Sequence, residues 1–228
     1  LSVIFGTYNR HQFLIRCLNS VRRAMGNLTH EIIVIDGGST DGSLSWLRFQ
    51  PDVTLIEHGE LRGPVAAYND GFHLATGKYV AYLNDDLMLG LGTLSAAVAM
   101  LEADDKLGVV SIPYRNPGTQ VVSLPLATIN GKKKYPFASF GVVPRSLGER
   151  AGWFTDKFYH YYGDIALCVN IQRMGYKIQA LPVQYACTHY CADNTMRGVN
   201  RWSDPNTSAK KDDAAFVAYW KGRVKSDG

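Results

Sequence analysis

The stretch TGKYVAYLNDD, residues 76–86, decides which fold we expect. Within it, Lys78–Leu83 is a short run of mostly apolar and aromatic residues, which is typical of a buried strand. Gly77 ends the helix expected before this strand, and the strand runs directly into Asn84–Asp86. Two adjacent carboxylates therefore stand at the end of a sheet, which is where open α/β sheets bind ligands.

Apolar strands and helical patterns alternate on both sides of this stretch. Further strands are expected at Leu1–Phe5, Glu31–Ile35, Val53–Ile56 and Val109–Ile112. Apolar residues at helical spacing predict helices at Phe13–Val21, Pro64–Ala75 and Leu94–Leu101. Strands separated by helices of this length predict an α/β fold with a Rossmann-like, mostly parallel sheet flanked by helices.

Two of the expected helices begin at residues that are typical of helix caps. Asn9 and Gln12 fit a capping box at the start of the first helix, because their side chains can satisfy early backbone N–H groups. Asp41 fits the cap of a short helix that runs through Leu47.

The second half of the chain is less regular. An irregular excursion or hairpin is expected at Pro113–Pro136, and a polar loop that closes as a lid is expected at Asp193–Ala209. The remaining strands are expected at Ala138–Val143, Ile178–Leu181 and Gln184–Thr188, and the remaining helices at Asp164–Met174 and Asp212–Lys225. The last helix is expected to have Phe216, Val217 and Trp220 on its apolar side. No segment has the composition of a linker, so we expect one domain over residues 1–228, in which 1–112 form one half, 113–190 a smaller second half and 191–228 a loop and final helix.

Composition excludes several classes of protein. The 228 residues are 46% hydrophobic and 19% charged, which argues against a disordered chain, a collagen or a coiled coil. The net charge of +4 is too mild to indicate nucleic-acid binding, and the apolar runs are too short to predict a transmembrane segment.

Four cysteines are too few for a disulfide scaffold, and with the lack of a signal segment they predict a cytoplasmic location. The basic run Lys132–Lys134 is either solvated or in contact with an anionic acceptor or a membrane face, and the last alternative would place the protein at the membrane periphery. Since the chain begins inside an apparent strand and without Met, we expect either a trimmed chain or a domain of a longer protein.

Polar residues concentrate in three loops, Thr7–Arg10, Asp36–Asp41 and Asn84–Asp86, each of which follows an expected strand. The adjacent carboxylates of Asp85 and Asp86 repel one another unless a cation or water compensates. A hard divalent cation suits them, because Mg²⁺ and Mn²⁺ prefer oxygen ligands and commonly bridge to phosphates. We take Asp86 as the metal ligand and Asp85 as a group that orients it or contacts sugar; a solvated turn is the alternative.

The other candidate groups have equally simple alternatives. Asp36 can accept a hydrogen bond from a nucleobase, and the glycines that follow it let the backbone approach a ligand, but a plain turn fits too. The helix start after Thr7–Arg10, with Arg10 itself, suits a nucleotide or is an ordinary capped helix. Asp164 opens a helix beside the aromatic run Tyr159–Tyr162, where it is either a helix cap or a reactive carboxyl group.

Taken in order, these motifs resemble the family 2 glycosyltransferases, which have a GT-A fold. The matching stretches are Ser2–Ile4 with Thr7–Arg10, Asp36–Gly42, Arg62–Gly63, Ala67–Gly71, Thr76–Tyr79 and Leu83–Asp86, with a weaker match at Gly163–Cys168, Arg173 and Gly175–Ile178. The resemblance covers about residues 1–190.

The resemblance implies an inverting, hexosyltransferase-type enzyme of polysaccharide biosynthesis that moves a sugar from a nucleotide-sugar donor to an acceptor hydroxyl. It implies that Asp86 binds Mn²⁺ or Mg²⁺ within a DxD-like motif and that Asp164 is the general base. It implies a donor site, for a UDP-sugar before other donors, formed by Thr7, Tyr8, Asn9, Arg10, Asp36, Gly38, Arg62, Asn69, Asn84 and Asp85. His189 falls where some family members place a metal or diphosphate contact, and a buried structural histidine is its alternative. The implied acceptor is a saccharide or a lipid-linked molecule.

The sequence departs from the family pattern at a few positions. Asn84 stands where the first acid of the DxD motif is usual, and Gly163 stands where a second acid often precedes Asp164. Ala166 and Asn170 replace acidic and basic residues that are often seen later in that motif. These departures leave open a second hypothesis, a nucleotide-sugar binding module with little or no transferase activity. A Rossmann dehydrogenase is disfavoured, because no G-x-G-x-x-G pattern follows the first strand.

Overall fold

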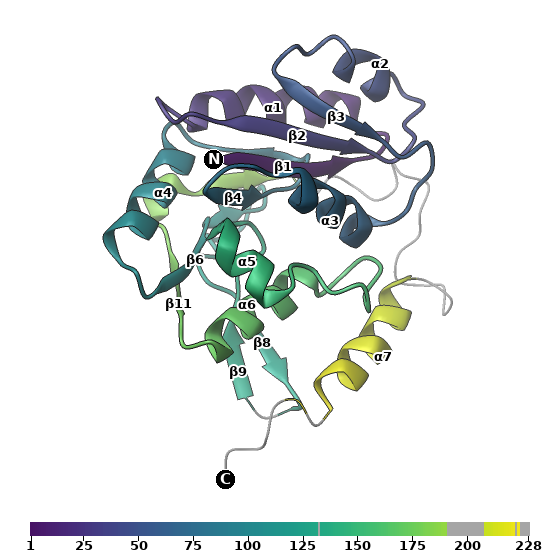
Figure 1. The fold of residues 1–228 in the computed structure, drawn as a ribbon. Helices are drawn as coiled ribbons and strands as arrows, with labels where there is room; N and C mark the ends of the chain where they lie inside the picture. The colour runs from purple at the N-terminus through teal and green to yellow at the C-terminus, as the bar shows by residue number, and fades with distance from the viewer. Residues whose placement is uncertain (132, 191–207, 222, 224–228) are drawn as a thin grey trace.

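The structure is a computed structural model that describes residues 1–131, 133–190, 208–221 and 223 (Figure 1). The Asp193–Ala209 lid predicted from the sequence lies almost wholly outside these residues. Within the described residues, no helix has both the length and the apolar composition needed to cross a bilayer. The cytoplasmic location and the single domain stay predictions.

A seven-stranded sheet, in the order β11-β6-β10-β4-β1-β2-β3, forms the centre of the molecule. Its strands are β1 (Ser2–Thr7), β2 (Glu31–Asp36), β3 (Val53–Glu57), β4 (Tyr79–Tyr82), β6 (Leu107–Ser111), β10 (Gly141–Pro144) and β11 (Lys177–Ala180). β1, β2, β3 and β4 pair in parallel, as do β6 and β11, whereas β10 runs antiparallel between β4 and β6. The predicted mostly parallel α/β sheet is therefore confirmed.

Helices cover both faces of this sheet, and each face has its own hydrophobic core (Figure 1). The elements on one face are α1 (His11–Ala24) and α4 (Thr93–Ala103), and those on the other are α3 (Pro64–Leu74), α5 (Arg145–Ala151) and α6 (Gly163–Arg173). The strands between them are buried on both sides, as β4 is at every position from Tyr79 to Tyr82. This double burial explains why these strands read as continuous apolar runs rather than as alternating patterns.

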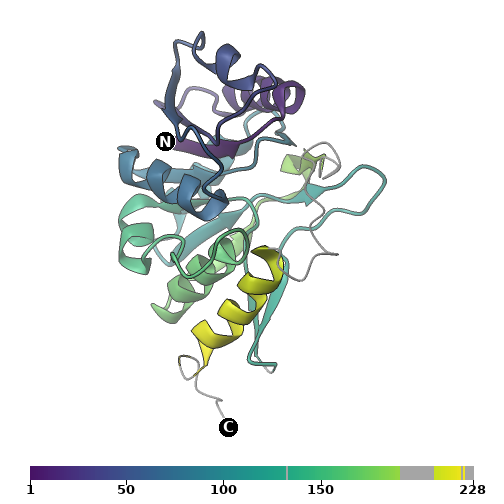
Figure 2. The same cartoon turned by 90° about the vertical axis from the view of Figure 1, so that its right-hand side faces the viewer.

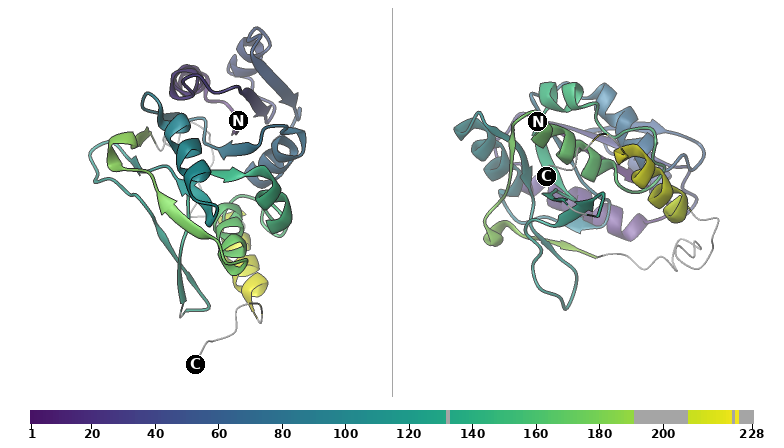
Figure 3. Two further views of the ribbon diagram at one scale, coloured as in Figure 1. Left: turned by 60° about the vertical axis from the view of Figure 1, so that its left-hand side comes forward. Right: turned by 90° about the horizontal axis from the view of Figure 1, so that it is seen from below.

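Smaller elements surround the main sheet. A three-stranded sheet contains β5 (Leu87–Met88), β12 (Cys187–His189) and β7 (Tyr114–Arg115), and the 3₁₀-helix η1 (Val183–Tyr185) precedes β12. The hairpin predicted within Pro113–Pro136 is formed by β8 (Leu126–Ile129) and β9 (Lys133–Pro136), and it extends away from the main sheet (Figure 3). The helix α7 (Ser208–Trp220) lies beside α6 and the hairpin (Figure 2).

Three expectations about local structure were wrong. Asn9 does not cap α1: its side-chain oxygen accepts from Thr40 N at 2.7 Å. Asp41 instead accepts from His11 N at the start of α1 (2.9 Å) and from Ser43 N at the start of the short helix α2, Ser43–Leu47 (3.0 Å). The strand expected at Gln184–Thr188 begins only at Cys187, and Val217 on α7 is 66% exposed, whereas Trp220 is 1% exposed. The expectation for Asn9 was wrong because Asp41, which is distant in the sequence, accepts the hydrogen bond at the start of α1 in its place.

Gly71 brings α3 against the strands β1 and β2. A Cβ atom at this position would lie 2.4 Å from Ile4 Cγ2 and 3.1 Å from Ile35 Cδ1. Both side chains are fully or almost fully buried, so neither can move aside at low cost. The close approach of helix and sheet therefore requires glycine here.

We predict that Gly71→Ala lowers the free energy of unfolding by about 1–3 kcal/mol, although alanine is the better helix former. Urea unfolding monitored by circular dichroism measures this change. Gly90→Ala is the matched control, because its Cβ would meet only the Thr93 hydroxyl at 3.3 Å. Equal stabilities of the two variants would contradict the packing argument.

Candidate active site

A cavity of about 600 Å³ opens at the carboxyl ends of the central parallel strands. Its wall includes residues from the ends of β1 and β2, the loop after β4, the segment before α3, the start of α6 and β12. Among the predicted site residues it contains Thr7, Tyr8, Arg10, Arg62, Asn84, Asp85, Asp86, Asp164 and His189. The structure thus gathers into one cavity residues that are up to 182 positions apart in the sequence, from Thr7 to His189.

The carboxylates of Asp85 and Asp86 are buried, each residue being 2% exposed. Arg10, itself 7% exposed, places one guanidinium nitrogen 3.1 Å from Asp85 Oδ1 and also within ion-pair contact of Asp86 Oδ2. Thr7 Oγ1 donates to the other oxygen of Asp85 at 2.8 Å. Burying charge is costly unless it is paired, so Arg10 compensates the two adjacent carboxylates.

His189 completes this cluster from β12. Its Nε2 lies 3.4 Å from Asp86 Oδ1, and its ring packs edge-on against Tyr114 and Phe140. Burial alone would raise the pKa of Asp86, but the hydrogen bonds and charges of His189 and Arg10 outweigh it and hold the pKa well below the ordinary value. Asp86 is therefore ionised throughout the neutral range.

The pair formed by Asp86 and His189 suits a divalent cation. An anionic oxygen and an imidazole nitrogen converge on one point of the cavity wall, and both atom types are ligands of Mn²⁺. Within the described residues, no group of three or more His, Cys, Asp or Glu side chains is arranged to hold a metal ion. A cation here would draw its other ligands from water and diphosphate, which is usual for Mg²⁺ and Mn²⁺.

Asp164 lies in the first turn of α6, on the wall of the same cavity. Burial raises the pKa of its carboxyl group to about 7, although backbone hydrogen bonds at Ile165 and at Asp164 itself partly oppose the shift. No basic side chain is among the causes of this shift, in contrast to Asp86. The cavity therefore contains two carboxyl environments, one that keeps its charge and one that exchanges a proton near neutral pH.

Asp36 is fully buried at the end of β2 and does not line the cavity wall. Its Oδ1 accepts from Gly38 N at 2.9 Å and from Ser39 N at 2.8 Å, so this oxygen shapes the loop after β2. Its Oδ2 has no hydrogen-bond partner within the described structure. The contact of Asp36 with a nucleobase stays a prediction.

Asn9 and Gly38 support the site without lining it. Asn9 joins the loop after β1 to the loop after β2, because its backbone N donates to Ser39 Oγ at 2.9 Å. A Cβ atom on Gly38 would lie 2.8 Å from Gly59 O, and its φ of +87° also favours glycine. The close approach at Gly38 is thus to backbone rather than to a ligand, and Gly37 lines the cavity instead.

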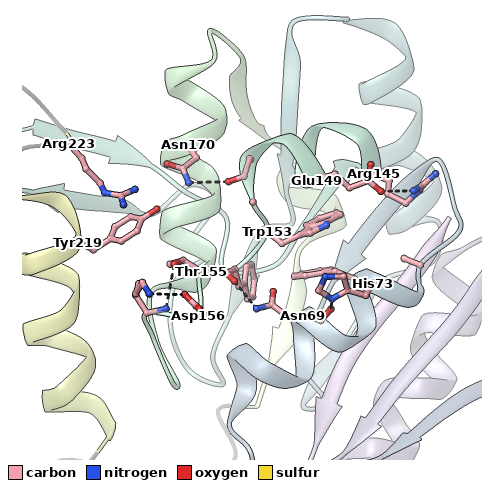
Figure 4. Close-up of a pocket in the computed structure, with 16 residues that line it drawn as sticks. Asn69, His73, Arg145, Glu149, Trp153, Thr155, Asp156, Asn170, Tyr219 and Arg223 are labelled. Carbon is pink, nitrogen blue, oxygen red and sulfur yellow. Dashed lines mark hydrogen bonds and ion pairs between the residues drawn. The ribbon is translucent and has the colours of Figure 1, made fainter.

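Asn69 lies in a different place from the one that the sequence suggested. It lines a second cavity of about 640 Å³ between α3, α5, α6 and α7, and its amide donates to Phe154 O at 2.7 Å (Figure 4). Arg62 does line the main cavity, where its Nη1 lies 3.4 Å from Asp70 Oδ2. Asn69 therefore holds α3 to the segment before α6 and is not part of the main cavity.

Sequence reasoning missed several residues of the cavity wall. They are mainly His58, Leu61, Tyr68, Tyr82, Tyr114 and Phe140. Tyr68 and Tyr82 belong to the stretches Ala67–Gly71 and Lys78–Leu83, which were already named from the sequence, so both could have been predicted. Tyr68 donates to Asn84 Oδ1 at 2.8 Å. Phe140 faces the cavity only because β10 inserts antiparallel next to β4, and no local pattern signals that insertion.

The model of the family described as "Glycosyl transferase family 2" matches residues 2–143, which is more than half of the chain. This chain belongs to glycosyl transferase family 2. The matched region contains Arg10, Asp85 and Asp86 but ends before Asp164 and His189. The family resemblance inferred from the ordered motifs is confirmed.

Relatives and solved structures agree with this assignment. An uncharacterised glycosyltransferase of Nostoc sp. is 35% identical over 114 residues, which is 48% of this chain and 35% of the relative. A poly(ribitol-phosphate) beta-glucosyltransferase of Bacillus spizizenii is 30% identical over 96 residues, which is 40% of this chain and 15% of the relative. The chain thus spans about a third or less of the length of these two relatives.

The fold is similar to that of a mannosyltransferase from Pyrobaculum calidifontis, solved in complex with GDP-Man and Mn²⁺. The TM-score is 0.65 at 24% identity, over 86% of this chain and 58% of that chain. The GT-A fold predicted from the sequence is confirmed.

We predict that Asp164→Asn stabilises the fold above pH 7. The raised pKa means that the folded state favours the protonated carboxyl, so ionisation costs stability as the pH rises from the ordinary value of 3.8 to about 7. Asparagine cannot ionise and avoids this cost, so the variant should gain about 1–3 kcal/mol over wild type at pH 8.

Urea unfolding at pH 5 and pH 8 measures this difference, which should be much smaller at pH 5. Asp156→Asn is the control, because the Asp156 side chain is 82% exposed. A gain that does not depend on pH would contradict the assignment of a half-buried carboxyl group with a raised pKa.

Proposed function

We propose that this chain is an inverting, metal-dependent glycosyltransferase that moves a sugar from a nucleotide-sugar donor to an acceptor hydroxyl. One observation carries the proposal: a single cavity contains an ionised Asp86 beside His189 and a separate Asp164 whose pKa is about 7. Two carboxyl groups with such different environments suit two different tasks in one reaction.

Asp86 and His189 are the residues that would hold Mn²⁺ or Mg²⁺, next to Asp85. When bound, the cation would neutralise the negative charge of the departing nucleoside diphosphate. Arg10 contacts both carboxylates, and its second role in this proposal is to offer N–H groups to the diphosphate, since a guanidinium suits phosphate oxygens. Thr7 fixes Asp85 in place through its hydroxyl.

Asp164 is the proposed general base. An acceptor hydroxyl must lose its proton as its oxygen attacks the anomeric carbon, and a carboxylate with a pKa near the working pH is suited to take that proton. The attacking oxygen forms its bond to the anomeric carbon on the face opposite the leaving group, and the bond to the diphosphate oxygen breaks. One base is sufficient for this inversion.

The nucleoside is proposed to lie near the ends of β1 and β2. Tyr8 and Gly37 line the cavity there, and the unpartnered Oδ2 of Asp36 lies at the end of β2. An acceptor oxygen at this position matches the ring N–H of uracil or of guanine. We propose a UDP-sugar as donor, and GDP-mannose, which the mannosyltransferase structure contains, is the competing donor in the test.

The acceptor is proposed to be a saccharide or a lipid-linked saccharide of a polysaccharide pathway. The cavity wall around Asp164 is aromatic, with Tyr159, Tyr162 and Phe154 among its residues. Aromatic faces suit the apolar faces of sugar rings. Tyr159 is 45% exposed and offers such a face at the cavity rim.

One observation supports the alternative of a binding module. A Cβ atom at Gly163 would lie 2.7 Å from the Phe154 ring, so the ring fills the space that an acidic side chain at position 163 would need. Only one carboxylate is therefore available at the start of α6. Release of nucleoside diphosphate from a donor in the presence of Mn²⁺ would separate an enzyme from a binding module.

We predict that Asp86→Asn weakens donor binding at least about tenfold in the presence of Mn²⁺, because it removes the anionic oxygen next to His189. Isothermal titration calorimetry with UDP-glucose and with GDP-mannose, each with and without Mn²⁺, measures the effect. Asp156→Asn, whose side chain is 82% exposed and does not line the main cavity, is the control for loss of one charge. Unchanged affinity for both the metal and the nucleotide would remove Asp86 from the site.

We predict that Asp164→Asn lowers turnover by a factor of about 10²–10⁴ and leaves the donor dissociation constant nearly unchanged. In the wild type, turnover should rise with pH through about 7, since the carboxyl must lose its proton to act as a base. Release of nucleoside diphosphate measured from pH 5.5 to 8.5 tests both points. A variant that keeps wild-type turnover would exclude Asp164 as the base.

A further inference from the structure

The helix α7 carries a buried carboxylate that reaches back to the wall of the cavity. Asp212 is 2% exposed, although its neighbours Lys211 and Asp213 are exposed. Its Oδ1 accepts from Tyr159 N at 2.8 Å, and its Oδ2 accepts from His160 N at 2.7 Å and from Tyr161 N at 2.8 Å. One side chain thus binds three consecutive backbone N–H groups that lie more than 50 positions earlier in the chain.

These three amides belong to the segment that leads into α6. The segment 159–161 is neither helix nor strand, so no regular backbone ladder satisfies its N–H groups. Hydrogen bonds to a charged acceptor are stronger than those to a neutral one, and successive N–H groups form a concave site for an anion. The Asp212 carboxylate therefore supplies the hydrogen-bond acceptors that hold this segment in its conformation.

The residue between this segment and α6 has an unfavourable backbone conformation. Tyr162 has a φ of +70°, which is uncommon for a residue with a bulky side chain. Its ring stacks on Phe216 of α7 with centroids 4.3 Å apart, and its hydroxyl contacts Asp213. The helix α7 thus also stabilises the turn that lies two residues before Asp164.

The same segment is hydrogen-bonded to the part of the cavity wall that precedes and begins α3. Tyr159 O accepts from Val65 N at 3.3 Å, and the Tyr159 hydroxyl donates to Leu61 O at 3.1 Å. Leu61 and Val65 line the cavity together with Asp164. The segment Tyr159–Tyr162 therefore joins the start of α6 to the wall residues before and at the start of α3.

The helix α7 is itself firmly held. Trp220 is 1% exposed within the hydrophobic core, and its carbonyl oxygen accepts from Asn130 Nδ2 at 3.2 Å. Phe158 packs against both Phe216 and Tyr219. Asp212 thus projects from a helix that packs into the hydrophobic core through Phe216, Tyr219 and Trp220.

We propose that Asp212 is a positioning residue that fixes the segment Tyr159–Tyr162 and, through it, places the Asp164 carboxyl group in the cavity. The inference rests on the proposed function, because it assigns Asp212 to the geometry of the base. Asp212 contacts neither donor nor acceptor in this proposal and acts only through the backbone that it binds.

The test compares Asp212→Asn and Asp212→Ser with wild type, and with Asp156→Asn as a control that removes an exposed carboxylate a few residues before the same segment. Asp212→Asn replaces one of the two acceptor oxygens with an NH₂ group, which cannot accept from a backbone N–H, so at least one of the three hydrogen bonds is lost. Asp212→Ser leaves a smaller acceptor and is the second variant in case the first does not fold. Release of nucleoside diphosphate from UDP-glucose and GDP-mannose with Mn²⁺, with water as acceptor, gives kcat and KM.

Both variants should lower kcat by about 10- to 100-fold, because small displacements of a reacting group have effects of this size, while KM for the donor changes little. Amide hydrogen exchange at residues 159–161 should become at least about tenfold faster in both variants and stay unchanged in the control.

Wild-type kcat in folded Asp212 variants would overturn the inference and leave the proposed function intact, even if their melting temperature falls. A rise in KM for the donor at an unchanged kcat would also overturn the inference. Absence of nucleoside diphosphate release from the wild type with either donor would instead overturn the proposed function, and this role of Asp212 with it.

Discussion

The pairing of Asp85 and Asp86 with Arg10 is the interaction on which the arrangement of the site depends. Two adjacent carboxylates that are almost wholly buried require a cation, and the guanidinium that supplies it comes from the start of α1. The requirement fixes the loop after β4 against the loop after β1. Since β1 pairs with both β2 and β4, the same register brings the loop after β2 to this edge. The hydrogen bond from Thr7 Oγ1 to Asp85 joins the same two loops but brings no positive charge, so the compensation of the two carboxylates depends on Arg10.

Burial has opposite consequences for the carboxyl groups of this cavity. Asp86 has Arg10 and His189 beside it and keeps its charge despite being buried. Asp164 has burial without a basic partner among the causes of its shift, so its pKa rises to about 7. The helix N-terminus and its backbone N–H groups limit this rise but do not reverse it. The difference between the two groups is therefore set by their neighbours rather than by the depth of the cavity.

The parts of the structure that the sequence could predict are those governed by local pattern or by the geometry of parallel sheets. The apolar runs and the helical spacing located the main strands and helices, and the carboxyl ends of parallel strands meet at one edge, so the meeting of Thr7 with Asp85 was foreseeable. The capping of α1 was not, because Asp41 reaches it from 30 positions away. The place of Asn69 was not foreseeable either: a residue on α3 can face either side, and Phe154 O, which it binds, lies on a segment with no regular pattern.

The role of Asp212 is a further feature that could not be predicted from the sequence. In the sequence it is one of two adjacent acids in a polar turn of a helix, and a surface position is the ordinary expectation for such a residue. The structure gives the adjacent acids different environments, because only Asp212 faces the backbone of residues 159–161. A segment without regular structure cannot satisfy its own amides, so it depends on an acceptor from elsewhere in the chain. The segment that leads into α6 is thus held by a helix that follows it in sequence, and that long-range contact is the part of the geometry around Asp164 that no local pattern predicts.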